Sequence, residues 1–190
     1  GAKLRVHLDG ARLWNAAVAL EVPPAALTVG VDTVQVCLSK GLGAPVGSLV
    51  AGSVEFVEEA RRIRKMLGGG VRQGGVLAAA GLVALERIDR LAEDHARARR
   101  LAEGLRERGW HVQDPETNIV LVSVADVPST LARFERAGVL ASALGGKVRL
   151  VTHADISDAD IKRALDRIGD AEREPDTPSA MAAPAKDSGS

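Results

Sequence analysis

A short apolar run that ends on a lysine and a glycine-rich turn constrains the fold of this 190-residue chain more than any other stretch. The run is VQVCLSKGLGAPVG, residues 34–47. Apolar residues occupy every second position at its start, which predicts a β-strand. Lys40 follows where that strand should end, and the glycines and proline after it predict a turn with little side-chain bulk. A lysine so placed could meet a flat organic cofactor, although a lone lysine after a strand is usually a solvated surface charge.

A second predicted strand ends on an acid. Apolar residues alternate over residues 4–9 and predict a strand that ends near Asp9. Ligands of open α/β sheets lie beyond the carboxyl ends of strands, so we expect Asp9 and Lys40 to be neighbours. Lysines form Schiff bases with carbonyl compounds, and enzymes that use pyridoxal 5'-phosphate (PLP) pair an aspartate with its pyridinium nitrogen. The alternative for Asp9 is a turn former before glycine.

Composition excludes several classes of function. Hydrophobic residues make up 46% of the chain, and 25 basic residues balance 25 acidic ones, as in an ordinary globular protein. This balance gives no reason to expect nucleic acid as a partner, and 2% aromatic residues argue against a surface that stacks on bases. No apolar run reaches the length of a membrane span. Cys37 is the single cysteine, so an internal disulfide is excluded, and we expect a small buried residue in a cytoplasmic protein.

Hydrophobic periodicity divides the chain into two regions. In the first, we expect strands at residues 4–9, 32–38 and 47–52, and helices at 11–20, 54–66 and about 73–85, with Ser53 as the N-cap of the helix over 54–66. The last of these is apolar on all sides and should therefore be buried. A charged helix over 88–108 leads into the second region, where we expect strands at 111–112, 118–124, 139–142 and 147–152 and helices at 128–136 and 158–168. This region is typical of an α+β module with an antiparallel sheet.

Five stretches together resemble one family. They are HLDGAR (7–12), CLSKGLGAPVGS (37–48), RKMLGGGVRQGGVLAAAGLVAL (64–85), TNIVLV (117–122) and KVRLVTHADIS (147–157). The chain resembles the low-specificity L-threonine aldolases over residues 4–169; these are PLP-dependent fold-type I enzymes of the β-eliminating lyase superfamily. The resemblance implies an α/β fold: the remainder of a PLP-binding large domain over 1–90, then a small C-terminal α+β domain over 91–171. We expect a disordered tail over 172–190.

The resemblance also implies roles for five residues. Lys40 matches the lysine that holds PLP covalently, and Asp9 matches the aspartate on the pyridine nitrogen. Arg12 matches an arginine that faces the phenolic oxygen of the cofactor and the substrate carboxylate. Arg149 matches the arginine that binds the α-carboxylate, and Arg72 matches one that reaches the cofactor phosphate of a neighbouring subunit. A homodimer or homotetramer is thereby implied.

Each of these residues has a simpler interpretation. Arg12 and Arg72 could be surface charges at helix starts, although a cation there opposes the helix dipole. Arg149 could lie on the solvent face of its strand. We expect His153 to be a hydrogen-bonded structural residue, and His95 and His111 to lie at the surface, while His7 could be either structural or functional. No cluster of metal-ligating residues has convincing spacing.

The implied reaction is the reversible cleavage of L-threonine or L-allo-threonine to glycine and acetaldehyde. Members of the family are much longer, and the chain resembles their C-terminal half, without the phosphate-binding loop and stacking histidine of the other half. Three hypotheses follow: part of a working aldolase, a truncated and inactive aldolase-like fragment that serves at most as an oligomerisation or binding module, or another PLP-dependent β-eliminating amino-acid lyase. Retention of the complete set Asp9, Arg12, Lys40, Arg72 and Arg149 favours the first.

Overall fold

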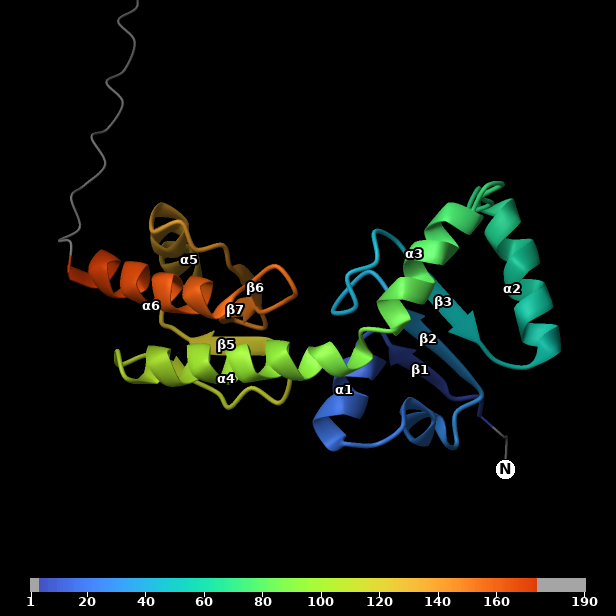
Figure 1. Cartoon of the computed structure of the whole chain (residues 1–190), viewed down its shortest axis with the longest axis horizontal. Helices are drawn as coiled ribbons and strands as arrows, with labels where there is room; N and C mark the ends of the chain where they lie inside the picture. The colour runs from blue at the N-terminus through green and yellow to red at the C-terminus, as the bar shows by residue number, and fades with distance from the viewer. Residues whose placement is uncertain (1–3, 174–190) are drawn as a thin grey trace, which may run out of the picture.

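The computed structural model describes residues 4–173, which form two lobes joined by one long helix (Figure 1). The N-terminal lobe (residues 4–90) holds a three-stranded sheet, and the C-terminal lobe (residues 91–173) holds a four-stranded sheet. The N-terminal lobe contains β1 (His7–Gly10), α1 (Leu13–Leu20), the 3₁₀ helix η1 (Pro24–Thr28), β2 (Thr33–Cys37), β3 (Ser48–Ala51), α2 (Val54–Met66), α3 (Gly75–Leu85) and the 3₁₀ helix η2 (Ile88–Arg90).

The C-terminal lobe begins with the joining helix. It contains α4 (Leu91–Arg106), β4 (His111–Val112), β5 (Ile119–Ser123), α5 (Val127–Arg136), β6 (Ser142–Leu144), β7 (Lys147–Val151) and α6 (Asp158–Arg173). Figure 1 shows α4 running from the N-terminal sheet and α1 to a position alongside α6. Within residues 4–173, no helix is long and apolar enough to cross a membrane. The division of the chain into domains at residues 90 and 91 stays a prediction.

The N-terminal sheet places two strand ends at one edge. Its order is β1-β2-β3, with β1 and β2 parallel and β3 antiparallel to β2. Asp9 lies opposite Gln35, and Gly10 opposite Val36. Because parallel strands point the same way, the chain leaves β1 and β2 at the same edge of the sheet, as expected for a ligand-binding edge.

Helix α2 confirms its expected bounds, whereas the expected burial of α3 is wrong. The Ser53 side chain accepts a hydrogen bond from Phe56 N at 3.3 Å and begins α2 as predicted. Of α3, only Gly81 and Ala84 are buried, and Val76 keeps 78% of its surface exposed. A helix that is apolar all round gives no preferred face, and the described residues cover only the side that meets the loop after β2.

The C-terminal sheet confirms the expected antiparallel module. Its order is β4-β5-β7-β6, and all three strand pairs are antiparallel. Alternate residues of β5 and β7 point into one closed core with side chains of α4, α5 and α6: Ala98, Leu101, Ala102, Leu105, Val120, Val122, Phe134, Val148, Leu150, Ile161 and Ile168. The three helices therefore cover one face of the sheet, and Arg149 lies on the opposite face.

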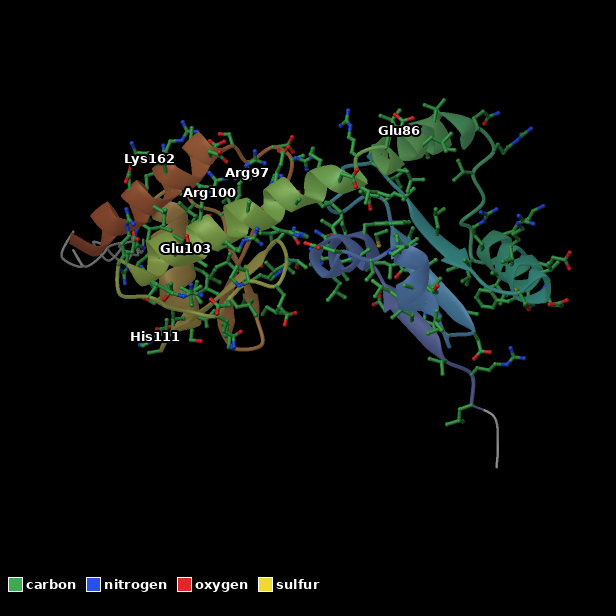
Figure 2. The ribbon with its side chains drawn as sticks, turned by 60° about the horizontal axis from the view of Figure 1, so that its bottom comes forward. Glu86, Arg97, Arg100, Glu103, His111 and Lys162 are labelled. Atoms are coloured by element: carbon green, nitrogen blue, oxygen red, sulfur yellow. The ribbon has the colours of Figure 1, made fainter. Side chains whose placement is uncertain are left out.

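Ion pairs also join α4 to α6. Arg97 and Arg100, which Figure 2 labels on α4, each donate to Asp158 Oδ1 over 2.9 Å. Asp158 is the first residue of α6, so this contact fixes where α6 begins on α4.

Two expected bounds in this lobe differ from the structure. The strand expected over 139–142 is wrong, because β6 begins only at Ser142. Val139 N instead donates to Phe134 O at 2.8 Å and closes the end of α5, next to Gly138 at φ 71°. Residues 172 and 173, expected to begin the tail, still belong to α6 because polar helix formers continue it to Arg173. The rest of that expected tail lies outside the described residues.

Candidate functional site

The loop after β2 is held by apolar side chains, while its lysine is exposed. Leu38, Leu42 and Ala44 are 4–6% exposed and pack into one cluster with Ala84 of α3. Ala44 N donates to Leu38 O at 3.0 Å, which closes the loop on itself. Lys40 lies between these anchors with its side chain exposed. The apolar contacts therefore hold the loop backbone in place, while the Lys40 side chain with its amine stays exposed.

Asp9 ends the neighbouring strand, as predicted. It is exposed, and its Oδ1 accepts a hydrogen bond from Ala11 N at 3.1 Å, so the carboxylate also shapes the turn into α1. Because β1 and β2 are parallel, Asp9 and the loop of Lys40 follow adjacent strands at one edge. The structure thus brings these two strand ends together, while their roles toward a cofactor stay predictions.

Two arginines from different lobes interact through their charges. Arg12 directly precedes α1, and Arg149 lies in β7. Burial, followed by the positive charge of Arg149, lowers the pKa of Arg12, with Cys37 acting in the opposite direction. Within the described residues, the Nε atoms of both arginines are buried and have no hydrogen-bond partner. Buried, unpaired donors on two like charges form a site that favours an anion.

Arg72 lies apart from this pair. It is exposed in the connection between α2 and α3, which Figure 1 shows at the tip of the N-terminal lobe. The opposite end of α3 packs on the loop of Lys40, since a Cβ at Gly81 would lie 3.0 Å from Leu38 Cδ1. The structure therefore does not bring Arg72 to the other four predicted residues of the same chain.

Most remaining side chains of interest have structural partners. Gln35 Nε2 donates to Ser48 Oγ at 2.6 Å and lies 3.1 Å from Cys37 Sγ, so partly buried Cys37 has polar neighbours. His7 Nδ1 lies 2.8 Å from Thr33 Oγ1. His153 Nδ1 accepts a hydrogen bond from Asp155 N at 3.3 Å, in agreement with a structural role. Among residues 4–173, no group of three or more His, Cys, Asp or Glu could hold a metal ion.

Sequence reasoning missed several deeply buried polar side chains. His95 was expected at the surface, and this is wrong because it is only 3% exposed. Asn15 and Asn118, each 2% exposed, were not singled out at all. One signal could have pointed to Asn15: it lies inside an otherwise apolar helix three residues after Arg12.

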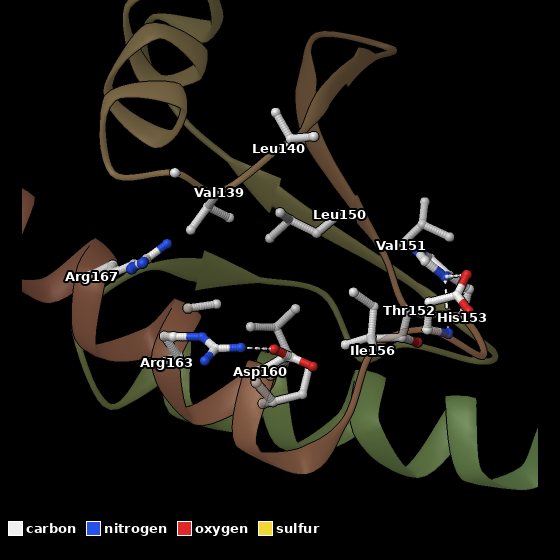
Figure 3. A pocket seen from close by; sticks show the side chains of 15 residues that line it. Val139, Leu140, Leu150, Val151, Thr152, His153, Ile156, Asp160, Arg163 and Arg167 are labelled. Atoms are coloured by element: carbon white, nitrogen blue, oxygen red, sulfur yellow. Dashed lines mark hydrogen bonds and ion pairs between the residues drawn. The ribbon is translucent and has the colours of Figure 1, made fainter.

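A separate pocket lies entirely within the C-terminal lobe. It has a volume of about 410 Å³ and is lined by residues of β7, α6 and the connection between α5 and β6 (Figure 3). Figure 3 shows Arg163 directed at Asp160, with which it forms an ion pair. None of the five predicted site residues lines it, so this pocket is distinct from the edge that carries Lys40.

The residues at that edge fit PLP and an amino acid. Lys40 is exposed and, within residues 4–173, forms no ion pair with a carboxylate. Asp9 supplies an anion at the adjacent strand end, as a pyridinium requires. The unpaired Nε donors of Arg12 and Arg149 suit the anionic groups of a cofactor or substrate.

Comparisons with known proteins agree with this fold and donor set. The family model of the beta-eliminating lyases matches residues 2–127. A probable low-specificity L-threonine aldolase 2 from Arabidopsis thaliana is 47% identical over 172 residues, which cover 85% of this chain and 48% of the relative. The low specificity L-threonine aldolase of Escherichia coli O157:H7 is 46% identical over 156 residues, which cover 81% of this chain and 47% of the relative.

Solved structures show the same fold. The threonine aldolase of Leishmania major superposes with a TM-score of 0.67 at 19% identity, over 87% of this chain and 51% of that chain. This likeness confirms the expected α/β fold class. The chain spans about half the length of the curated relatives it matches.

Proposed function

This chain belongs to the beta-eliminating lyase family, and we propose that it serves the PLP-dependent cleavage of L-threonine or L-allo-threonine to glycine and acetaldehyde. Relatives named as low-specificity threonine aldolases support this substrate class. One observation carries the proposal: Arg12, close to the strand end that carries Asp9, and Arg149, from the other lobe, interact through their charges, and both have buried Nε donors without a hydrogen-bond partner among the described residues. An amino acid offers the carboxylate that these donors lack.

The N-terminal lobe would hold the cofactor. The amine of Lys40 would bind the aldehyde carbon of PLP, and Asp9 would accept a hydrogen bond from the protonated pyridine nitrogen. PLP supplies, when bound, a conjugated ring that takes up the electron pair released as the substrate Cα–Cβ bond breaks. Because the loop of Lys40 is anchored by Leu38, Leu42 and Ala44, its amine would act from a fixed backbone position.

The two arginines would orient the substrate. A planar guanidinium binds a carboxylate through two parallel hydrogen bonds, which fixes the direction of the group as well as its place. A carboxylate between Arg12 and Arg149 would give both Nε atoms a partner and would favour the charged form of Arg12, whose pKa is lowered first by burial and then by the charge of Arg149. With the carboxylate fixed, the bond to be broken keeps one orientation, which is catalysis by positioning.

Arg72 would act on a second subunit. Its exposure, and its place at the end of α3 away from the loop of Lys40, support a role outside the site of its own chain. Apolar side chains around it, such as Leu67 and Val76, are each 78% exposed and would be covered by a neighbouring subunit. This arrangement supports a homodimer or homotetramer.

Covalent binding of PLP tests the proposal directly. The purified chain is mixed with PLP, treated with borohydride and digested, and the peptide that carries the PLP mass is identified. We expect the label on Lys40 and its loss in Lys40→Ala, while Lys65→Ala, at another exposed lysine, retains it. Equal labelling of Lys40→Ala and the unaltered chain would overturn the assignment. Release of acetaldehyde from L-threonine is then measured on PLP-loaded protein that has not been treated with borohydride, which tests the reaction itself.

A further inference from the structure

Four buried polar side chains meet between the two lobes. They are each at most 3% exposed and come from α1, α4 and the ends of two strands: Asn15, His95, Asn118 and Thr152, which we call the junction cluster. Burial of polar groups costs free energy unless each group finds a hydrogen-bond partner. Because hydrogen bonds depend on direction, such a cluster constrains the relative orientation of the elements it joins more than apolar contact alone would.

Asn15 is the centre of the junction cluster. Its Nδ2 lies 3.1 Å from His95 Nε2 and 3.4 Å from Asn118 Oδ1. An amide nitrogen carries two hydrogens and can only donate, so Asn15 donates to both partners and His95 Nε2 accepts. Burial, with a smaller contribution from Arg99, lowers the pKa of His95, which favours the neutral ring that can accept. One side chain of α1 thus binds two elements of the C-terminal lobe.

Asn118 also forms hydrogen bonds with the residue that follows β7. Its Nδ2 donates to Thr152 O at 2.8 Å, and Thr152 N donates back to Asn118 O at 3.0 Å. Thr152 Oγ1 also donates to the backbone oxygen of Asp94 in α4 at 2.7 Å. Thr152 directly follows β7, three residues after Arg149. The strand that carries Arg149 is therefore tied to Asn15 through Asn118.

The other side of Asn15 touches the loop of Lys40. A Cβ on Gly41 would lie 3.0 Å from Asn15 Oδ1 and 2.7 Å from Leu91 Cδ2, so any larger residue would have to displace the side chains of Leu91 and Asn15. Gly41 is the residue after Lys40, and Arg12 lies three residues before Asn15 at the start of α1. Asn15 thus contacts the residue next to Lys40 and lies one turn from Arg12.

Apolar packing at the same place specifies the angle between the lobes less sharply than hydrogen bonds do. Leu91 is fully buried beside Gly41 and holds α4 against the N-terminal lobe. The hydrophobic effect behind this contact is non-directional. Hydrogen bonds need both a short distance and a narrow range of angles. The junction cluster therefore adds the direction that Leu91 does not provide.

We propose that Asn15 is a positioning residue, which fixes β7 relative to the loop of Lys40 so that Arg149 and Arg12 can bind one carboxylate. The inference rests on the proposed function only for the identity of that carboxylate. Asn15 touches neither substrate nor cofactor in this scheme. Its loss should leave each lobe folded and widen the range of angles between them.

The angle between the lobes is measured first, because this needs neither cofactor nor activity. Spin labels are placed on exposed Ala19 of α1 and exposed Ser123 of β5 in a Cys37→Ser background, and their distance distribution is recorded on the full chain. We expect the distribution to broaden about twofold in Asn15→Ala, as for a fixed interface that becomes a hinge. Asn118→Ala, which cuts the same link from the other lobe, should broaden it similarly. Val18→Ala, an apolar truncation in α1 outside the junction cluster, should not.

Kinetics on the PLP-loaded protein with native Cys37 then separate positioning from chemistry. We expect Asn15→Ala to raise the KM for L-threonine about tenfold while kcat changes less, as when one charge-assisted hydrogen bond to the substrate is weakened. An unchanged distance distribution in both Asn15→Ala and Asn118→Ala would overturn the proposal, whatever the activity. A broadened distribution in a protein without any threonine cleavage would support the positioning role and refute the proposed reaction instead.

Discussion

The two lobes bury apolar side chains to very different extents. The C-terminal lobe encloses a core that joins three helices and two strands, with Phe134 2% exposed and Leu105 fully buried. The buried cluster of the N-terminal lobe has five members, one of which, Leu91, is supplied by α4. Among residues 4–173, α2 and α3 expose large apolar side chains such as Met66 at 65% and Val76 at 78%.

The lobe that buries more apolar surface supplies fewer of the proposed site residues. The lobe with the complete core contributes one of the proposed site residues, Arg149, from the middle of a strand. The lobe with the sparse core contributes Asp9, Arg12 and Lys40, all at strand ends or helix starts, and Arg72 in the connection between α2 and α3. Functional groups are commonly carried by such connecting segments, while the packed elements behind them supply the rigidity. Here much of that rigidity comes from the neighbouring lobe through α4 and Asn15.

The largest effect is expected from truncation in the C-terminal core. Phe134→Ala would remove a buried ring that meets Trp110 edge-on, with centroids 5.4 Å apart, and should lower the free energy of unfolding by about 3–5 kcal/mol. Val76→Ala in α3 should change it by less than about 0.5 kcal/mol, because Val76 is 78% exposed. Urea unfolding followed by circular dichroism measures both. Similar losses at the two positions would remove the contrast between the lobes.

A smaller effect distinguishes two helix glycines. In α4, a Cβ on Gly104 would collide with the side chain of Leu165, so Gly104→Ala should cost about 1–3 kcal/mol through overpacking. In α3, a Cβ on Gly75 meets nothing within 4 Å, so Gly75→Ala should stabilise by up to about 1 kcal/mol through helix propensity. Thermal unfolding of the two variants provides the measurement. Destabilisation by Gly75→Ala would mean that α3 is covered more tightly than its exposure indicates.

The smallest effect concerns the pH dependence of the junction between the lobes. Burial and the charge of Arg99 lower the pKa of His95 below the value of the unfolded chain. As the pH falls below about 6.5, the unfolded chain therefore takes up a proton that the folded chain refuses, and stability falls until the pKa of folded His95 is reached. One such proton contributes at most about 1.4 kcal/mol for each pH unit.

Two variants isolate this contribution. His95→Gln should flatten the fall in unfolding free energy between pH 7 and pH 5, whereas His111→Gln, at an exposed histidine of β4, serves as the matched control. Urea titrations at several pH values measure the slope. An identical slope in His95→Gln and the unaltered chain would show that the junction cluster does not titrate in this range.

Local pattern was sufficient for most elements. Alternation predicted β1, β2 and β7, and the position of Ser53 predicted the first residue of α2. The strand expected at 139–142 failed because the apolar residues there close α5 rather than pair with β7. Burial of α3 failed for a different reason: composition says that a helix has apolar faces, but not whether another segment lies against them.

The candidate site shows the same limit more sharply. Motifs pointed to Lys40, Asp9, Arg12 and Arg149, and the structure gives neighbouring positions to the strand ends and to the two arginines. The sequence could not reveal that Asn15 contacts His95 and Asn118, which follow 80 and 103 positions later. An isolated asparagine in an apolar helix is a weak signal by itself, because its partners are defined only when the lobes come together.

Helix α4 makes the molecule sensitive to small rotations. Its first residue, Leu91, belongs to the apolar cluster of one lobe, and its later residues, such as Leu105, belong to the core of the other. Sixteen residues make a lever arm of about 24 Å, so a tilt of about 5° at Leu91 moves the far end by about 2 Å. β5 and β7 move with this arm. The position of α4 at Gly41 and Leu91 must therefore be closely defined, since a small rotation there becomes a larger displacement at the opposite end of the C-terminal lobe.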